Sequence, residues 1–283
     1  MINVILFYKF VDLEDLDRIK KDHLKFCLDL GVKGKVLLAK EGINGSISGT
    51  EEQIEKYKSF LSNNELFKGI EFKEEIAIHH PFDKMVIKVK NEIIRIDKSL
   101  DMSKVGKHIS PQEFLESYNG QNVVVLDTRN DYEFNAGRFK GAINPEIKTF
   151  REFPNFVDGL KISRDTPIVM YCTGGIRCEK ASAYMINKGF TNVSQLHGGI
   201  INFCQKLPNT AWEGSCFVFD KRLTSDVEGN QSPVSDCIHC CIKSDQYRNC
   251  KNKFCNKLMF VCPDCQKQMH NCCSEDCMKK ILR

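Results

Sequence analysis

Cysteine is distributed very unevenly along this 283-residue chain: ten of its fifteen cysteines lie between Cys237 and Cys277. This stretch has weak apolar periodicity, so it predicts a small, loop-rich region (209–283) held together by bound metal rather than by an apolar core. Two Cys-x-x-Cys pairs have the spacing of a zinc ribbon, and a second set of four is completed by either Cys272 or Cys273, of which we assign Cys272. The predicted structural zinc ligands are Cys237, Cys240, Cys262 and Cys265 for the first site, and Cys250, Cys255, Cys272 and Cys277 for the second.

The alternatives to zinc are disulfides and unliganded thiols, and the cellular compartment bears on the choice. The N-terminus lacks the basic start, long apolar core and cleavage site of a signal peptide, and no apolar run approaches the ~20 residues of a membrane span. We therefore expect a cytoplasmic protein with no membrane partner, in which thiols stay reduced.

Charge is also concentrated at the C-terminal end. Residues 237–283 carry nine Lys/Arg and four Asp/Glu, whereas the whole chain has a net charge of only +4. Aromatic residues such as Tyr247 and Phe254 stand among these basic residues. This pattern suits single-stranded RNA, in which phosphates are neutralised and bases stack, but a solvated basic surface is the alternative.

The first region, residues 1–97, has the element order β-α-β-β-α-β, which is typical of a ferredoxin-like split βαβ domain. The expected strands are Ile2–Phe10, Val32–Lys40, Gly45–Ser48, Ile70–Ile76 and Met85–Val89, and the expected helices are Leu13–Leu30 and Glu51–Leu61. Residues 98–107 are predicted to form a linker. The fold class is thus multidomain, with an α+β domain first.

Residues 108–207 change to alternating strands and helices. The apolar runs Val123–Leu126, Ile168–Tyr171 and Thr191–Leu196 read as buried strands, with a helix over Glu179–Lys188. This alternation predicts an α/β domain with a mostly parallel sheet.

One segment of this domain carries reactive chemistry. Cys172 follows a buried strand, and Arg177 and Cys178 stand where the next helix starts. The residues between them, Thr173, Gly174, Gly175 and Ile176, form a candidate anion-binding loop whose backbone N–H groups surround the sulfur. Such surroundings lower a thiol pKa, so we assign Cys172, Arg177 and Cys178 as catalytic residues. A buried structural cysteine is the alternative for Cys172, and a small apolar helix residue for Cys178.

The run Cys172-Thr-Gly-Gly-Ile-Arg177 resembles the C-x-x-G-x-R active loop of rhodanese domains. Asp127-Thr-Arg129 and Leu196-His-Gly-Gly-Ile200 resemble other motifs of that family, and the resemblance covers residues 108–207. The six residues from Cys172 to Arg177 are fewer than cysteine phosphatases use, which implies a pocket for sulfane sulfur rather than phosphate.

Lys40–Gly49, Met170–Ala181 and the cysteine-rich tail narrow this resemblance to the bacterial tRNA uridine(34) hydroxylase family. The resemblance implies hydroxylation of the wobble uridine to 5-hydroxyuridine, with molecular oxygen as co-substrate, Cys172 as the active cysteine and the tRNA anticodon arm as partner. Cys178 either resolves an oxidised Cys172 or tunes the loop.

Two other functions share parts of this pattern. A sulfurtransferase would carry a persulfide on Cys172, and a non-enzymatic protein would bind RNA or sense redox state through its metal-held tail. The chain has no Rossmann glycine fingerprint, hence no flavin or nicotinamide signature. The sequence identifies neither an electron donor nor an oligomeric state.

Overall fold

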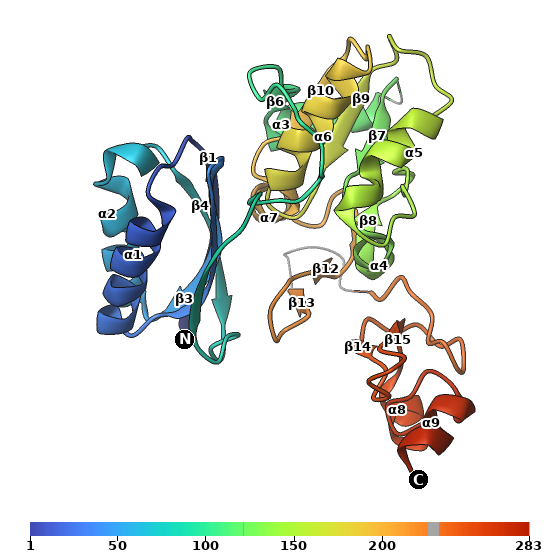
Figure 1. Ribbon diagram of the computed structural model, residues 1–283. Helices are drawn as coiled ribbons and strands as arrows, with labels where there is room; N and C mark the ends of the chain where they lie inside the picture. The colour runs from blue at the N-terminus through green and yellow to red at the C-terminus, as the bar shows by residue number, and fades with distance from the viewer. Residues whose placement is uncertain (121, 226–231, 283) are drawn as a thin grey trace. The chain divides into compact units, whose positions relative to one another are not determined.

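The structure is a computed structural model that describes residues 1–120, 122–225 and 232–282. The chain divides into two compact units, Met1–Lys98 and Ser99–Arg283, which are described separately below (Figure 1). The cysteine-rich region expected from residue 209 onward falls within the second unit.

The first unit is a five-stranded sheet covered on one face by two helices (Figure 1). The strand order is β4-β1-β3-β2-β5, in which every pair is antiparallel except β2 with β5. The first four strands have the ferredoxin-like arrangement, so that prediction is confirmed. The elements are β1 (Ile2–Phe10), α1 (Leu16–Leu30), β2 (Lys33–Ala39), β3 (Gly42–Gly49), α2 (Glu51–Ser62), the short 3-10 helix η1 (Glu65–Phe67), β4 (Glu71–Ala77) and β5 (Met85–Val89).

Two boundaries in this unit differ from the expected ones. Helix α1 starts at Leu16 rather than Leu13, because Asp15 has a φ of 45° and its side chain accepts a hydrogen bond from the Arg18 N–H. Strand β3 starts at Gly42 rather than Gly45. A Cβ at Gly42 would lie 2.0 Å from the Lys9 carbonyl oxygen, so only glycine lets the hairpin pair this early.

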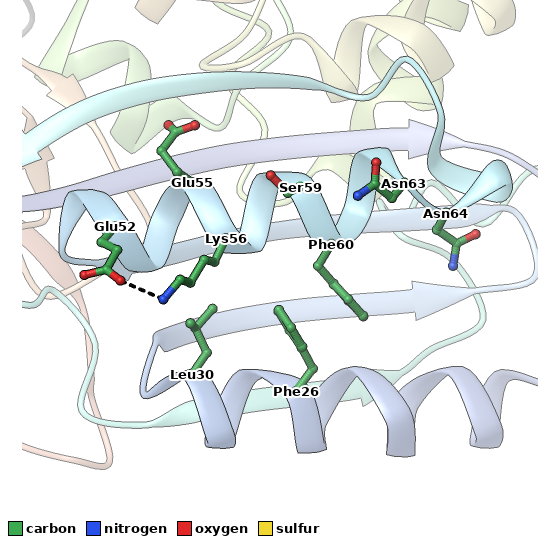
Figure 2. Close-up of a pocket in the computed structure, with 9 residues that line it drawn as sticks. All are labelled: Phe26, Leu30, Glu52, Glu55, Lys56, Ser59, Phe60, Asn63 and Asn64. Atoms are coloured by element: carbon green, nitrogen blue, oxygen red, sulfur yellow. Dashed lines mark hydrogen bonds and ion pairs between the residues drawn. The ribbon is translucent and has the colours of Figure 1, made fainter.

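A surface groove runs between α1 and α2 (Figure 2). Its floor is the stacked pair Phe26 and Phe60, whose ring centroids are 3.9 Å apart. The remaining lining residues are Leu30, Glu52, Glu55, Lys56, Ser59, Asn63 and Asn64. The groove contains no nucleophilic cysteine, so it is separate from the chemistry predicted above.

The second unit begins with a parallel sheet in the order β6-β10-β9-β7. Its elements are β6 (Lys107–Ile109), α3 (Pro111–Asn119), β7 (Val124–Asp127), α4 (Asp131–Ala136), β8 (Gly137–Phe139), the 3-10 helix η2 (Phe150–Glu152), α5 (Phe153–Gly159), β9 (Ile168–Tyr171), α6 (Ile176–Asn187), β10 (Val193–Leu196) and α7 (Gly199–Lys206). Strand β6 begins inside the expected linker, since residues 107–109 pair with β10. The predicted parallel α/β layer is confirmed.

Aromatic packing holds α3 and α7 against one face of this sheet. The Phe139 ring lies 4.6 Å from Phe114 of α3, 4.8 Å from Tyr171 of β9 and 4.8 Å from Phe203 of α7. All four rings are buried, which fixes β9 at the centre of the core and therefore fixes where its last residue points.

The cysteine-rich region is built from short hairpins and two short helices. Strand β11 (Trp212–Gly214) pairs with β8, and Tyr247 stacks on Tyr132 of α4 at 5.8 Å. The other elements are β12 (Cys216–Phe217), β13 (Thr224–Ser225), β14 (Tyr247–Asn249), β15 (Leu258–Phe260), α8 (Pro263–Gln268) and α9 (Glu275–Ile281). No helix in the described part of the chain is both long and apolar enough to cross a membrane.

Candidate functional site

The predicted reactive loop lies at the carboxyl end of β9 and leads directly into α6. Cys172 directly follows the last residue of β9. Helix α6 begins at Ile176, three residues before its expected start at Glu179. Gly175 immediately precedes α6 with a φ of 106°, a conformation that L side chains rarely adopt. Its N–H donates to the Cys172 sulfur at 3.1 Å. The tight turn therefore aims backbone donors at the thiol, as predicted.

The start of α7 holds this loop from the other side. The N–H groups of Ile200 and Ile201 donate to the carbonyl oxygens of Cys172 (3.0 Å) and Thr173 (3.2 Å). Gly199 has a φ of 67°, and a Cβ there would lie 2.4 Å from the Cys172 carbonyl oxygen. The Gly-Gly motif after Leu196 thus lets the α7 backbone approach the reactive loop, a role that the motif alone does not reveal.

Arg177 is fixed by a buried carboxylate. Its two terminal nitrogens donate to Glu133 of α4 at 2.5 and 2.8 Å, and one of them also donates to the Thr173 hydroxyl at 3.2 Å. The Glu133 side chain is 0% exposed and that of Arg177 is 6% exposed. Glu133 resembles part of the rhodanese pattern, but the sequence analysis assigned it no role in the site, since its local contacts form only a capping box with Asn130.

These contacts make Cys172 an acidic thiol. Burial opposes its ionisation, but the Cys178 hydrogen bond, the positive charge of Arg177 and the backbone N–H groups of Arg177 and Gly175 outweigh burial and lower the pKa of Cys172 to about 5. At neutral pH the sulfur is therefore a thiolate, the nucleophilic form of cysteine.

Cys178 occupies the first turn of α6 and is fully buried. It hydrogen-bonds to Cys172, and the Thr128 hydroxyl lies 3.6 Å from its sulfur. Burial and the neighbouring Cys172 thiolate raise the pKa of Cys178 well above its usual range. The two predicted cysteines are thus brought together as one thiolate and one thiol.

Eight of the ten C-terminal cysteines form two clusters, each with four sulfur atoms within 4.8 Å of one another. The first contains the four predicted residues, Cys237, Cys240, Cys262 and Cys265. The second contains Cys250, Cys255, Cys273 and Cys277. Cys273 therefore replaces the assigned Cys272, because its sulfur lies 3.7 Å from that of Cys277, whereas the Cys272 thiol points toward the His270 carbonyl.

The sulfur spacings test whether these clusters fit a metal. Neighbouring sulfurs are 3.6 Å apart between Cys240 and Cys262, and 3.5 and 3.7 Å apart from Cys273 to Cys255 and Cys277. Disulfide sulfurs would be about 2.05 Å apart. A tetrahedral zinc with Zn–S bonds of about 2.3 Å would separate its ligands by about 3.8 Å. Both donor sets therefore fit a closed tetrahedral sulfur site.

Three known family models match successive segments of the chain. The family model for the UPF0176 acylphosphatase like domain matches residues 2–93, the rhodanese-like domain matches residues 110–206, and the rhodanase C-terminal model matches residues 213–278. Among solved structures, a rhodanese-like domain from Anabaena is 19% identical with a TM-score of 0.33, over 39% of this chain and 80% of that one.

Curated relatives match over nearly the whole length. A tRNA uridine(34) hydroxylase of Cytophaga hutchinsonii is 40% identical over 277 residues, which is 97% of this chain and 89% of that protein. One of Bacillus cytotoxicus is 38% identical over 281 residues, or 97% of this chain and 87% of that protein. The chain therefore belongs to the tRNA uridine(34) hydroxylase family.

Proposed function

We propose that this protein hydroxylates C5 of the wobble uridine of tRNA to give 5-hydroxyuridine, with Cys172 as its nucleophile. The observation that carries this proposal is the thiolate of Cys172 at the end of β9, hydrogen-bonded to Gly175 N–H and next to the charged Arg177. The whole-chain relatives carry the hydroxylase name, which supports this reaction over simple sulfur transfer.

The uracil ring resists oxidation at C5 until C6 is attacked. Addition of the Cys172 thiolate to C6 forms a C–S bond and moves negative charge onto C5 and the O4 carbonyl, where molecular oxygen can react. In this mechanism the backbone N–H groups of the loop and the Arg177 guanidinium, which surround the Cys172 sulfur, stabilise the negative charge. Oxygen adds to C5 as a hydroperoxide, and two electrons cleave its O–O bond to leave a C5 hydroxyl group and water. Loss of the C5 proton and release of the sulfur from C6 then restore the C5–C6 double bond.

Cys178 completes the electron balance. Oxygen insertion requires two electrons, because only one oxygen atom enters the product and the other leaves as water. Oxidation of Cys172 and Cys178 to a disulfide releases two electrons and two protons. The overall reaction is then uridine, O₂ and two thiols giving 5-hydroxyuridine, water and a disulfide, and a cellular dithiol reductant resets the pair.

The C-terminal region supplies zinc-held structure and contacts to the anticodon arm. Two structural zinc ions bound by the clusters above would order the hairpins β14–β15 and the helices α8 and α9 without taking part in catalysis. Phe254 is fully exposed among Lys251, Lys253 and Lys257, as an RNA-stacking residue should be. Tyr247 is buried against Tyr132, so it is not available for stacking.

Since tRNA is the substrate, we place the reaction in the cytoplasm.

The test is mass spectrometry of nucleosides from unmodified tRNA incubated in air with the reduced protein. The wild type should add one oxygen to the wobble uridine, whereas Cys172→Ala should add none. Cys204→Ala is the matched control, since Cys204 is also buried in the second unit but burial raises its pKa to about 12. Hydroxylation by Cys172→Ala would refute the mechanism, and sulfur uptake from thiosulfate without any hydroxylation would favour the sulfurtransferase.

A further inference from the structure

Phe219 is an exposed aromatic residue at the reactive site. It lies in the turn between β12 and β13, and its side chain is 64% exposed, whereas Phe217 two residues earlier is buried. Its ring centroid lies 5.8 Å from the guanidinium carbon of Arg177, the residue that shares the loop with Cys172. A phenyl ring is thus presented to solvent beside the charged group that lowers the pKa of the Cys172 thiol.

Hydrogen bonds and an ion pair link the residues of the turn that carries Phe219. The Val218 N–H donates to the Leu223 carbonyl at 2.9 Å, and Arg222 forms a bidentate pair with Asp220 at 2.6–3.2 Å. Leu223 adopts a φ of 60°, which is strained for a bulky side chain.

Other aromatic side chains pack against the Phe219 ring. Phe219 packs edge to face on Phe217 at 5.1 Å, and Phe217 in turn packs on Tyr132 (5.2 Å) and Tyr247 (5.3 Å). Tyr132 lies on α4, the helix that carries Glu133, so the ring and Arg177 are attached to the same support. Phe219 is therefore prepositioned, and a planar ligand would not need to order it.

We infer that Phe219 is the stacking platform for the uracil ring of the wobble nucleotide. This inference rests on the proposed function. An enzyme that attacks C6 of a base must remove that base from its stack. It must then bind one face of the base while the nucleophile reacts with C6. Aromatic side chains bind bases in this way, and Phe219 is an exposed ring held next to the Cys172 loop.

The Phe219→Trp variant reports RNA binding through the fluorescence of its new tryptophan, without catalytic turnover. The natural protein has a single tryptophan, Trp212, which is 3% exposed. Titration with an anticodon stem–loop should quench the new tryptophan, and a stem–loop that is abasic at the wobble position should quench it much less. The same titration of the parent protein gives the background. Equal quenching by both RNAs would overturn the inference.

Turnover supplies the second readout. Phe219→Ala should lower kcat/KM for the stem–loop about 5- to 150-fold, the range for loss of one base–aromatic stack. Phe219→Tyr should retain most of the activity, and the rate of Cys172 alkylation should be unchanged in both variants. Leu28→Ala, which truncates a 61% exposed side chain on α1, is the control.

The outcomes separate this inference from the proposed function. If the wild type hydroxylates and Phe219→Ala is equally active, the stacking role is wrong and the function stands. If the wild type does not hydroxylate but the tryptophan responds only to RNA with a wobble base, the stacking role stands and the function is wrong. If Phe219→Ala changes the pH profile of Cys172 alkylation, the ring acts through Arg177 and the inference is wrong.

Discussion

The buried pair between Arg177 and Glu133 should set both the stability of the second unit and the acidity of Cys172. Neutralising either partner leaves the other charge buried without its counterion, which costs about 3–5 kcal/mol. For a unit of this size that free energy corresponds to a melting temperature lowered by about 6–20 °C. Glu133→Gln and Arg177→Gln should therefore be destabilised to a similar degree.

The two substitutions should act on Cys172 in opposite directions. The Cys178 hydrogen bond, the Arg177 charge and the loop N–H groups together lower the pKa of Cys172 to about 5, so Arg177→Gln should raise the midpoint of thiolate formation by about 1–3 pH units. Glu133→Gln removes a negative charge and leaves Arg177 in place, so it should lower that midpoint. Because only the thiolate reacts, the rate of iodoacetamide alkylation as a function of pH measures both midpoints.

Glu52→Gln is the matched control for stability. Glu52 pairs with Lys56 at 2.6 Å, but the two side chains are 77% and 59% exposed, so the substitution should leave the urea midpoint nearly unchanged. A change this small in Glu133→Gln, measured by urea unfolding, would refute the buried-pair argument. Alkylation midpoints that move in the same direction in both loop variants would refute the electrostatic argument.

Further predictions concern glycine, metal and pH. Gly199→Ala should destabilise the second unit and disturb the Cys172 loop, because its Cβ would lie 2.4 Å from the Cys172 carbonyl oxygen. Gly189→Ala, at a φ of 88° with nothing within 4 Å, should cost only about 1 kcal/mol by thermal melting. Metal analysis should find about one zinc fewer in Cys273→Ser but not in Cys272→Ser, and a chelator should unfold the C-terminal hairpins in a circular dichroism or proteolysis assay. Alkylation of wild-type Cys172 should be fast at pH 7 and fall as the pH drops through about 5, and a midpoint near 9 would contradict the loop geometry.

Local patterns were sufficient for most of the fold. The apolar run Ile168–Tyr171 and the glycines after Cys172 predicted a buried strand followed by a tight turn and a helix, and this arrangement is observed. The element order of the first unit likewise predicted its four ferredoxin-like strands. Element ends were less predictable, since the start of α1 depends on the left-handed backbone of Asp15.

The candidate site was only partly predictable. Cys172, Arg177 and Cys178 are close in the sequence, so their shared loop follows from local spacing. Glu133 is 44 residues before Arg177, and Phe219 is 42 residues after it. The sequence analysis placed neither residue at the loop, because contacts between distant segments depend on how the helices and hairpins pack around the sheet.

The sequence by itself therefore determined which elements form and which cysteine lies in the candidate reactive loop, because strand burial, glycine turns and Cys-x-x-Cys spacing are local properties. Only the tertiary structure decided which carboxylate neutralises Arg177, which aromatic ring stands exposed beside it, and that Cys273 rather than Cys272 joins the second sulfur cluster. Adjacent cysteines have the same local pattern, and only the direction of each side chain in the folded chain distinguishes them.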